Sequence, residues 1–353
     1  MEVNQMDAST RLLLAACVVG FLQVPTAMAA PLATGAWSAD DPLMTPAEAS
    51  ARTTWRDTMA HLPPPAEGCF HATYPNTNWQ ADTCKTLTRH IHPIPHRVHW
   101  GASETTGNTY DYALQSSSLI SKTVGSFPQV SGVTSEKGVG VAAFGGGGVL
   151  GPNEYSLQLN SNYDSTTSVC NGHSGCTVWQ QFVYATDYET QGEAAVFMQY
   201  WLIGYGSSCP SGWFSGGGTY CYRNSNAVSA PDVPATQLAN LKLTGSATAN
   251  GNDTITFANG NTAYSVSAKD SVVKLATVWK LSEFNVVGNA GGSSANFNSG
   301  SSITVKVAAT NGSTAAPTCA AKAGTTGETN NLNLGSCSAA GGSTPSITFT
   351  EAN

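Results

Sequence analysis

Side-chain character that alternates with a period of two residues is the feature that most constrains the fold of this chain. It is clearest in three segments, EYSLQLNSNY (154–163), TVWQQFVYA (177–185) and AAVFMQYWLIGY (194–205). Such alternation, with β-branched and aromatic residues, predicts β-strands. The third segment is apolar on both faces, which predicts a strand in the middle of a sheet that is covered on both sides.

The rest of the chain from Tyr110 onward has the same character. Asn-Gly pairs and Gly/Ser runs separate further short apolar segments and indicate turns. The segment DTITFANGNTAYSVS (253–267) predicts a β-hairpin. Strands do not alternate with helices as a parallel sheet would require. We therefore predict an all-β protein, an antiparallel β-sandwich of two sheets with a small helical or irregular N-terminal segment.

Glutamine is unexpected inside strands of this kind. Gln158, Gln180, Gln181 and Gln199 all lie within the three segments. A buried amide that lacks a hydrogen bond costs about 1–3 kcal/mol. Two interpretations are open: the glutamines lie on a half-exposed face or bond to one another, or they line a polar cleft that crosses a sheet.

The N-terminus has the pattern of a secretory signal peptide. Arg11 precedes the apolar run 12–24, and Ala27-Met28-Ala29 forms a small-residue cleavage site. We predict a signal peptide over residues 1–29 and a secreted protein, extracellular or periplasmic.

The cysteines agree with export. Eight remain after residue 29, and an even number in an exported chain indicates disulfides. Their clustering along the sequence predicts local pairs, and no C-x-x-C spacing indicates zinc. The predicted pairs are Cys69–Cys84, Cys170–Cys176, Cys209–Cys221 and Cys319–Cys337.

Residues 30–104 differ from the β-rich remainder at 105–353. They hold six of the seven histidines and a candidate helix that begins after Thr45, with Glu48 completing a capping box. We expect a removable pro-region or a loosely attached subdomain. The histidines fit a solvated segment, a metal site or a pH-triggered release switch, with the first favoured because no H-E-x-x-H spacing is present.

Charge limits the classes of partner. Only 10% of residues are charged, the formal net charge is −7 and no basic run is present, which argues against nucleic acid. After the signal peptide no segment is long and apolar enough to cross a bilayer. We expect a monomer that acts away from membranes, without a metal ion or other cofactor.

Familiar catalytic motifs are absent. The chain has no G-x-S-x-G and no H-E-x-x-H, and its only histidine past residue 100 is His173. Chemistry would have to come from carboxylates and amides. Glu283 lies between two apolar stretches, and it is either a functional acid or part of a strand-end ion pair with Lys280 or Lys306.

The order of several short motifs resembles the glutamic peptidases of the eqolisin type. The motifs are TVGSFPQV, LQLNSNY, WQQFVY, TITFANGNTAYSVS, W-x-x-S-E-F-N-V and SITFTEAN, which together span about residues 105–310 or reach the C-terminus. The chain departs from the family at Gln181, where the family has an acid, in the absence of a second acid after Glu283, and in lacking a W-V-G-I-D-G segment.

The resemblance implies a lectin-like, concanavalin A-like sandwich with Gln158 and Glu283 as the catalytic pair. Glu283 would activate water as a general base, and Gln158 would stabilise the oxyanion, which favours acidic pH. The substrate would be a polypeptide, with Trp179, Gln181, Gln199 and Trp201 as candidate substrate-binding residues. The alternatives are a structural extracellular protein or a carbohydrate-binding module that stacks sugars on Trp179, Trp201, Trp213, Tyr220 and Tyr222.

Overall fold

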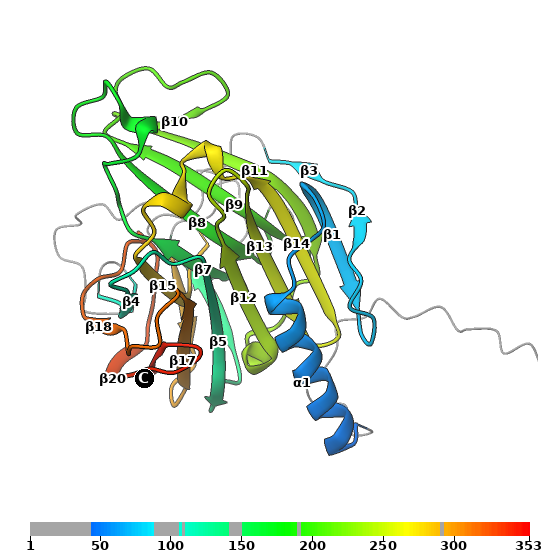
Figure 1. Ribbon diagram of the computed structural model, residues 1–353. Coiled ribbons are helices and arrows are strands. Elements are labelled where there is room, and N and C mark those ends of the chain that lie inside the picture. The colour runs from blue at the N-terminus through cyan, green and yellow to red at the C-terminus, as the bar shows by residue number, and fades with distance from the viewer. Residues whose placement is uncertain (1–43, 88–105, 108–109, 141–149, 189–191, 290–292) are drawn as a thin grey trace, which may run out of the picture. The chain divides into compact units, whose positions relative to one another are not determined.

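The computed structural model describes residues 44–87, 106–107, 110–140, 150–188, 192–289 and 293–353. In this part of the chain two nine-stranded sheets pack face to face, which confirms the predicted antiparallel sandwich (Figure 1). The predicted signal peptide and four of the histidines, at positions 90, 92, 96 and 99, lie outside the described residues.

Sheet 1 is antiparallel throughout and joins strands from both ends of the chain. Its order is β2 (Gln80–Asp82), β1 (Gly68–Thr73), β14 (Thr262–Lys269), β13 (Asn252–Asn259), β12 (Leu241–Ser246), β5 (Lys122–Ser131), β17 (Ser302–Thr310), β21 (Ser346–Ala352) and β20 (Asn333–Ala340). The predicted hairpin at 253–267 is β13 and β14.

Sheet 2 carries the three segments that dominate the sequence, as β7, β8 and β9. Its order is β10 (Phe214–Gly217), β11 (Tyr220–Ala230), β9 (Ala194–Ile203), β8 (Thr177–Ala185), β7 (Ser156–Ser161), β15 (Leu281–Val287), β4 (Ala113–Gln115) and β18 (Thr318–Ala320), and β3 (Lys85–Thr86) pairs with β11. As predicted, β9 lies inside the sheet and is covered on both faces.

Smaller elements complete the described part. A third sheet contains β19 (Thr329–Asn330), β16 (Ser294–Phe297) and β6 (Glu136–Val139), and its β16–β19 pair is parallel. Short 3₁₀-helices are η1 (Ser168–Cys170), η2 (Ala235–Asn240), η3 (Asp270–Val272) and η4 (Leu275–Thr277).

The core between the two large sheets is aromatic and tightly packed. Tyr184 of sheet 2 stacks on Phe257 of sheet 1 with ring centroids 3.9 Å apart, and Phe284 packs against Phe127 at 5.1 Å. Phe284 lies directly over Gly125, where a Cβ would stand 2.2 Å from its ring. Glycine is required at 125 because the sheets approach too closely for any side chain.

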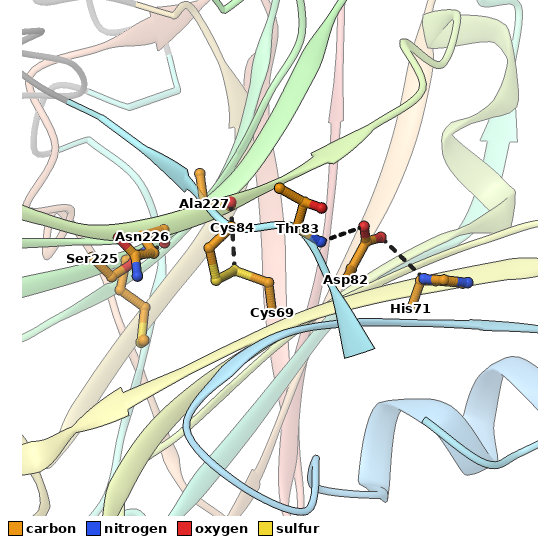
Figure 2. The surroundings of a disulfide bond; sticks show 9 residues. Cys69, His71, Asp82, Thr83, Cys84, Ser225, Asn226 and Ala227 are labelled. Atoms are coloured by element: carbon orange, nitrogen blue, oxygen red, sulfur yellow. Dashed lines mark hydrogen bonds and ion pairs between the residues drawn. A yellow bond between two sulfur atoms is a disulfide. The ribbon is translucent and has the colours of Figure 1, made fainter. Parts of the chain in front are cut away.

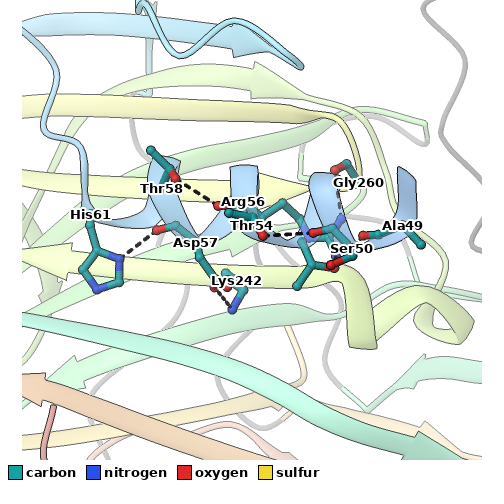
Figure 3. Close-up of polar contacts among 10 residues, drawn as sticks. Ala49, Ser50, Thr54, Arg56, Asp57, Thr58, His61, Lys242 and Gly260 are labelled. Atoms are coloured by element: carbon teal, nitrogen blue, oxygen red, sulfur yellow. Dashed lines mark hydrogen bonds and ion pairs between the residues drawn. The ribbon is translucent and has the colours of Figure 1, made fainter. Parts of the chain in front are cut away.

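Residues 44–87 are built into the sandwich. Helix α1 (Pro46–His61) begins at Thr45, whose hydroxyl accepts a hydrogen bond from the Glu48 N–H at 3.2 Å, as the sequence predicts. Figure 3 shows Arg56 donating to the Gly260 carbonyl at 3.0 Å and Lys242 paired with Asp57, which fix the helix to β12 and to the β13–β14 turn.

Strand β1 extends the same integration to the sheets. It pairs with β14 over six residue pairs. The expected boundary at residue 104 is therefore not a structural boundary for residues 44–87, and release of this segment would require β1 and β2 to leave sheet 1. Its cleavage remains a prediction.

All four predicted disulfides are confirmed. The pairs are Cys69–Cys84, Cys170–Cys176, Cys209–Cys221 and Cys319–Cys337, with Cα atoms 5.4–6.1 Å apart. Figure 2 shows the first pair beside Ala227 of β11, close to the hydrogen bond between His71 and Asp82. This bridge joins β1 of sheet 1 to the segment that enters β3 on sheet 2. Four disulfides indicate an oxidising, extracellular environment.

The close approach at Gly125 yields a stability prediction. Gly125→Ala should lower the free energy of unfolding by about 1–3 kcal/mol, because the added methyl group overpacks against Phe284. Ser126→Ala, one residue along β5, is the control and should change stability by about 0.5 kcal/mol or less. Chemical denaturation of both variants tests this, and equal stability of the two would contradict the packing described.

Candidate active site

A row of polar side chains crosses the face of sheet 2 that points away from sheet 1. The row follows directly opposed positions on five neighbouring strands. Its members are Asn224, Gln199, Gln181, Asn160 and Glu283. Of the four glutamines noted in the sequence, Gln158 and the two in this row share one face, whereas Gln180 points into the core and donates to Asp253 at 2.9 Å.

Gln158 and Glu283 lie diagonally across the neighbouring strands β7 and β15. Glu283 is directly opposite Asn160, and Gln158 is opposite Asn285, so both side chains emerge on the same face. The Asn160 amide lies between them and donates to Gln158 Oε1 at 3.3 Å and to Glu283 Oε2 at 3.2 Å. The two residues predicted as a catalytic pair are thus brought together.

Gln181, the neighbour of Asn160 in the row, holds this arrangement in place. Gln181 Nε2 donates to Gln158 Oε1 at 3.1 Å and to Asn160 Oδ1 at 2.9 Å. Further along, Gln199 Nε2 donates to Asn224 Oδ1 at 2.9 Å. All four glutamines are therefore buried, not half-exposed. Gln158 and Gln181 bond to each other and to Asn160, but Gln181 Oε1 has no hydrogen-bond partner. The polar line crosses the sheet as the second interpretation expects, but it is buried.

A C-terminal segment covers the pair. We call residues 321–332, between β18 and β20, the strap; the Cys319–Cys337 disulfide joins the strands on either side of it. Glu283 Oε2 accepts hydrogen bonds from the Thr325 N–H at 2.7 Å, the Thr325 hydroxyl at 2.9 Å and the Thr326 N–H at 3.3 Å.

The strap bonds to Gln158 as well. The Thr326 hydroxyl donates to Gln158 Oε1 at 2.6 Å, and Gln158 Nε2 donates to Glu328 Oε2 at 3.4 Å. As a result Gln158 and Glu283 are each only 1% exposed. The partners of Glu283 are thus Asn160 and the strap, and the expected alternative of an ion pair with Lys280 or Lys306 is not what holds it.

Burial raises the pKa values of Glu283 and of a buried acid near it, Asp111. For Glu283, the hydrogen bonds from Thr325, Asn160 and Thr326 partly offset that rise. The Glu283 Oε1 atom has no hydrogen-bond partner. Asp111 has a pKa raised well above its usual range, first by burial and then by repulsion from Glu283 and Glu351. The site therefore favours protonated carboxyl groups more than water does.

Asp111, Glu283 and Glu351 form what we call the acid cluster, and the side-chain amide of Asn285 links two of them. Asn285 Nδ2 donates to Asp111 Oδ2 at 2.8 Å and to Glu351 Oε2 at 3.1 Å. Burial raises the pKa of Glu351 to about 7, although hydrogen bonds from Asn285, Thr106 and Asn330 oppose the shift.

The predicted substrate-binding tryptophans lie on the same face, next to the polar row. Trp179 and Trp201 are directly opposed on β8 and β9 and are fully buried. Trp179 Nε1 donates to Thr325 Oγ1 at 3.0 Å, and Trp201 Nε1 donates to Gln199 Oε1 at 2.7 Å. With the buried Tyr222 they form a packed aromatic cluster. In this conformation the three rings do not form an exposed platform for sugars.

Sequence reasoning did not assign several residues of the site. Asn160 had a usable signal, because it alternates in phase with Gln158 along β7. The strap had a weaker one, because the predicted Cys319–Cys337 pair brackets a short polar loop. Asp111 and Glu351 had none, since only the paired strands show that they meet at Asn285.

Comparisons of the chain with models of protein families, with curated proteins and with solved structures found no match. Among the described residues, no helix is long and apolar enough to span a bilayer. In the same part of the chain, no group of three or more histidine, cysteine, aspartate or glutamate side chains is placed to hold a metal ion. Function must therefore be argued from the chemistry of the polar row.

The acid cluster predicts greatest stability at acidic pH. The pKa is about 7 for Glu351 and is raised for Asp111 and Glu283, against about 4 in an unfolded chain. Between these values the folded state holds more protons than the unfolded state, so the free energy of unfolding falls as pH rises from about 4 to 7. The melting temperature, measured by differential scanning fluorimetry from pH 4 to 8, should decline accordingly.

Two variants test the source of this slope. Glu351→Gln removes one buried titrating group and should flatten the decline, whereas Glu193→Gln, at an exposed site, should leave it unchanged. A melting temperature that rises toward neutral pH would contradict the assignment.

Proposed function

We propose that the protein is a secreted, acid-acting endopeptidase of the glutamic type, with Glu283 as the general base and Gln158 as the oxyanion donor. The observation that carries the proposal is that one amide, Asn160, donates to both residues on a single sheet face. A carboxylate and a carboxamide held together in this way supply what attack of water on a peptide bond requires.

The surroundings of Glu283 suit the base. Burial raises its pKa, so its ionised form is a stronger base toward water than a free glutamate, and its protonated form persists to higher pH for donation to the leaving amine. Glu283 Oε1 has no partner and is available to a water molecule. After it takes a proton from that water, the same carboxyl group can protonate the leaving amine.

Gln158 suits the oxyanion donor. Its Oε1 atom is fixed by donors from the sheet, Asn160 and Gln181, which orient the amide and direct its Nε2 group away from them. Nε2 now donates to Ser156 Oγ and Glu328 Oε2. A substrate carbonyl that replaced Glu328 would receive the same N–H donor as negative charge developed on it.

The strap occupies the space that a substrate needs. Its backbone N–H groups at 325 and 326 bond to Glu283, as groups of a bound peptide would. Activity therefore requires the strap to move. The disulfides support the secreted setting, and the burial of Trp179, Trp201 and Tyr222 makes carbohydrate binding the weaker alternative.

Substitution of the pair tests the proposal. Glu283→Gln is isosteric and should abolish cleavage of denatured casein at acidic pH while the protein stays folded. Gln158→Ala should lower kcat by about 10²–10³, the usual cost of an oxyanion donor. Glu351→Gln is the control, because it is also a buried, isosteric change but lies beyond Asn285. Casein cleavage by Glu283→Gln at the wild-type rate would exclude the mechanism.

A second test concerns the strap. Thr326→Val keeps the side-chain shape but removes the hydroxyl that bonds to Gln158 and Glu328. We expect faster amide hydrogen exchange across residues 321–332, measured by mass spectrometry, together with a higher rate of casein cleavage. Thr304→Val, on the surface of sheet 1, is the matched control. Faster exchange without faster cleavage would show that the strap does not limit access.

A further inference from the structure

Two buried glutamates lie apart from the polar row without any hydrogen-bond partner. Glu136, in β6, is 2% exposed and Glu154, just before β7, is 1% exposed. None of their four carboxylate oxygens has a partner. The Glu154 carboxylate lies against Gly138, where a Cβ would come within 1.7 Å of its Oε2 atom. The absence of a side chain at 138 is what leaves room for this carboxylate.

A buried amide oxygen adds to the same cluster. Asn289 is fully buried, and its Nδ2 group donates to the Thr186 carbonyl at 2.6 Å, which leaves Oδ1 without a partner. The Asn289 amide lies beside the Glu154 carboxyl group and opposes the rise of the Glu154 pKa, but no hydrogen bond of normal geometry joins the two. Three neighbouring side chains thus present five buried, unpartnered oxygens.

Among the described residues, the charged groups that shift the pKa values of Glu136 and Glu154 are carboxylates. Burial, together with repulsion from Glu154 and Asp187, raises the pKa of Glu136 to about 9. Burial and repulsion from Asp187 raise the pKa of Glu154 to about 7. Protonation alone would remove the charge but would leave the carboxyl groups without hydrogen-bond partners, at a cost for each. A bound cation would balance the negative charge and would also be coordinated by the unpartnered oxygens.

We propose that Glu136, Glu154 and Asn289 bind a calcium ion. Calcium takes six to eight oxygen ligands from carboxylates, amide carbonyls, backbone carbonyls and water, and these three side chains supply oxygen only. The site has two carboxylates, so it does not belong to the clusters of three or more acids, histidines or cysteines, of which the described residues contain none. Extracellular calcium sites of modest charge bind in the range of about 10⁻⁴–10⁻³ M.

The position of the site gives it a structural role. Glu154 immediately precedes β7, and Asn289 follows the end of β15, the two strands that carry Gln158 and Glu283. Glu136 belongs to β6 of the third sheet. A calcium ion would join these three elements at one end of sheet 2. This proposal does not depend on peptidase activity.

Thermal unfolding tests calcium binding directly. Protein stripped with EGTA should gain about 5 °C in melting temperature when calcium is added to about 100 times its dissociation constant, because the ion binds the folded state only. Magnesium, which requires a tighter octahedral site, should give a much smaller shift. The double variant Glu136→Gln/Glu154→Gln should lose the calcium shift, and Glu351→Gln should keep it.

A spectroscopic measurement on the wild-type protein covers the case in which the double variant does not fold. Terbium bound at this site should show sensitised luminescence from Tyr155, which is adjacent to Glu154 in the chain and is affected by the charge of Glu136. Calcium should displace the terbium and remove the signal. No calcium-dependent shift in melting temperature and no displaceable terbium signal would overturn the proposal and leave Glu136 and Glu154 as protonated acids.

Discussion

A carboxyl group that is 1% exposed must find its hydrogen bonds inside the protein, and Glu283 finds them in one neighbouring amide and in the strap. This constraint organises the whole outward face of sheet 2. Asn160 can serve Glu283 only because Gln181 holds its oxygen, and Gln181 is fixed in turn by Gln158. Glu283, Asn160, Gln181 and Gln158 are therefore one connected network, in which the loss of one member leaves its neighbours buried and unsatisfied.

Under the proposed function, the strap would give this network two states with different chemistry. With the strap in place, its backbone N–H groups bond to the Glu283 carboxylate, and its threonine and glutamate side chains bond to the Gln158 amide. Both residues are then held in place and inaccessible. With the strap displaced, the same atoms would face water and substrate. A site assembled by buried hydrogen bonds can stay ordered through such a change because Asn160 and Gln181 belong to the sheet and not to the strap.

Much of the architecture could be predicted from the sequence. Period-two alternation fixed the strands β7, β8 and β9, and cysteine clustering gave the four disulfides, because both signals are local. The facing of Gln158 and Glu283 depended on a pairing between strands more than 100 residues apart, which only the resemblance to a family suggested. The integration of residues 44–87 was missed, because the histidine- and proline-rich composition hid the pairing of β1 with β14.

The burial of the site was also beyond the sequence. Nothing local indicates that Thr325 and Thr326 bond to Glu283, since the strap reaches it only through the pairing of β18 with β4 and of β20 with β21. The acids Glu136 and Glu154 are a similar case. Each is unremarkable in its own segment, and only the fold reveals that their oxygens lie buried without partners.

The central claim is that this face of sheet 2 hydrolyses peptide bonds, and peptide mapping of a protein substrate tests it most directly. Denatured casein, incubated with the wild-type protein and with Thr326→Val from pH 2.5 to 7, should yield new peptides that are most abundant at acidic pH. Casein that stays intact with both proteins across this range, while both remain folded, would contradict the account.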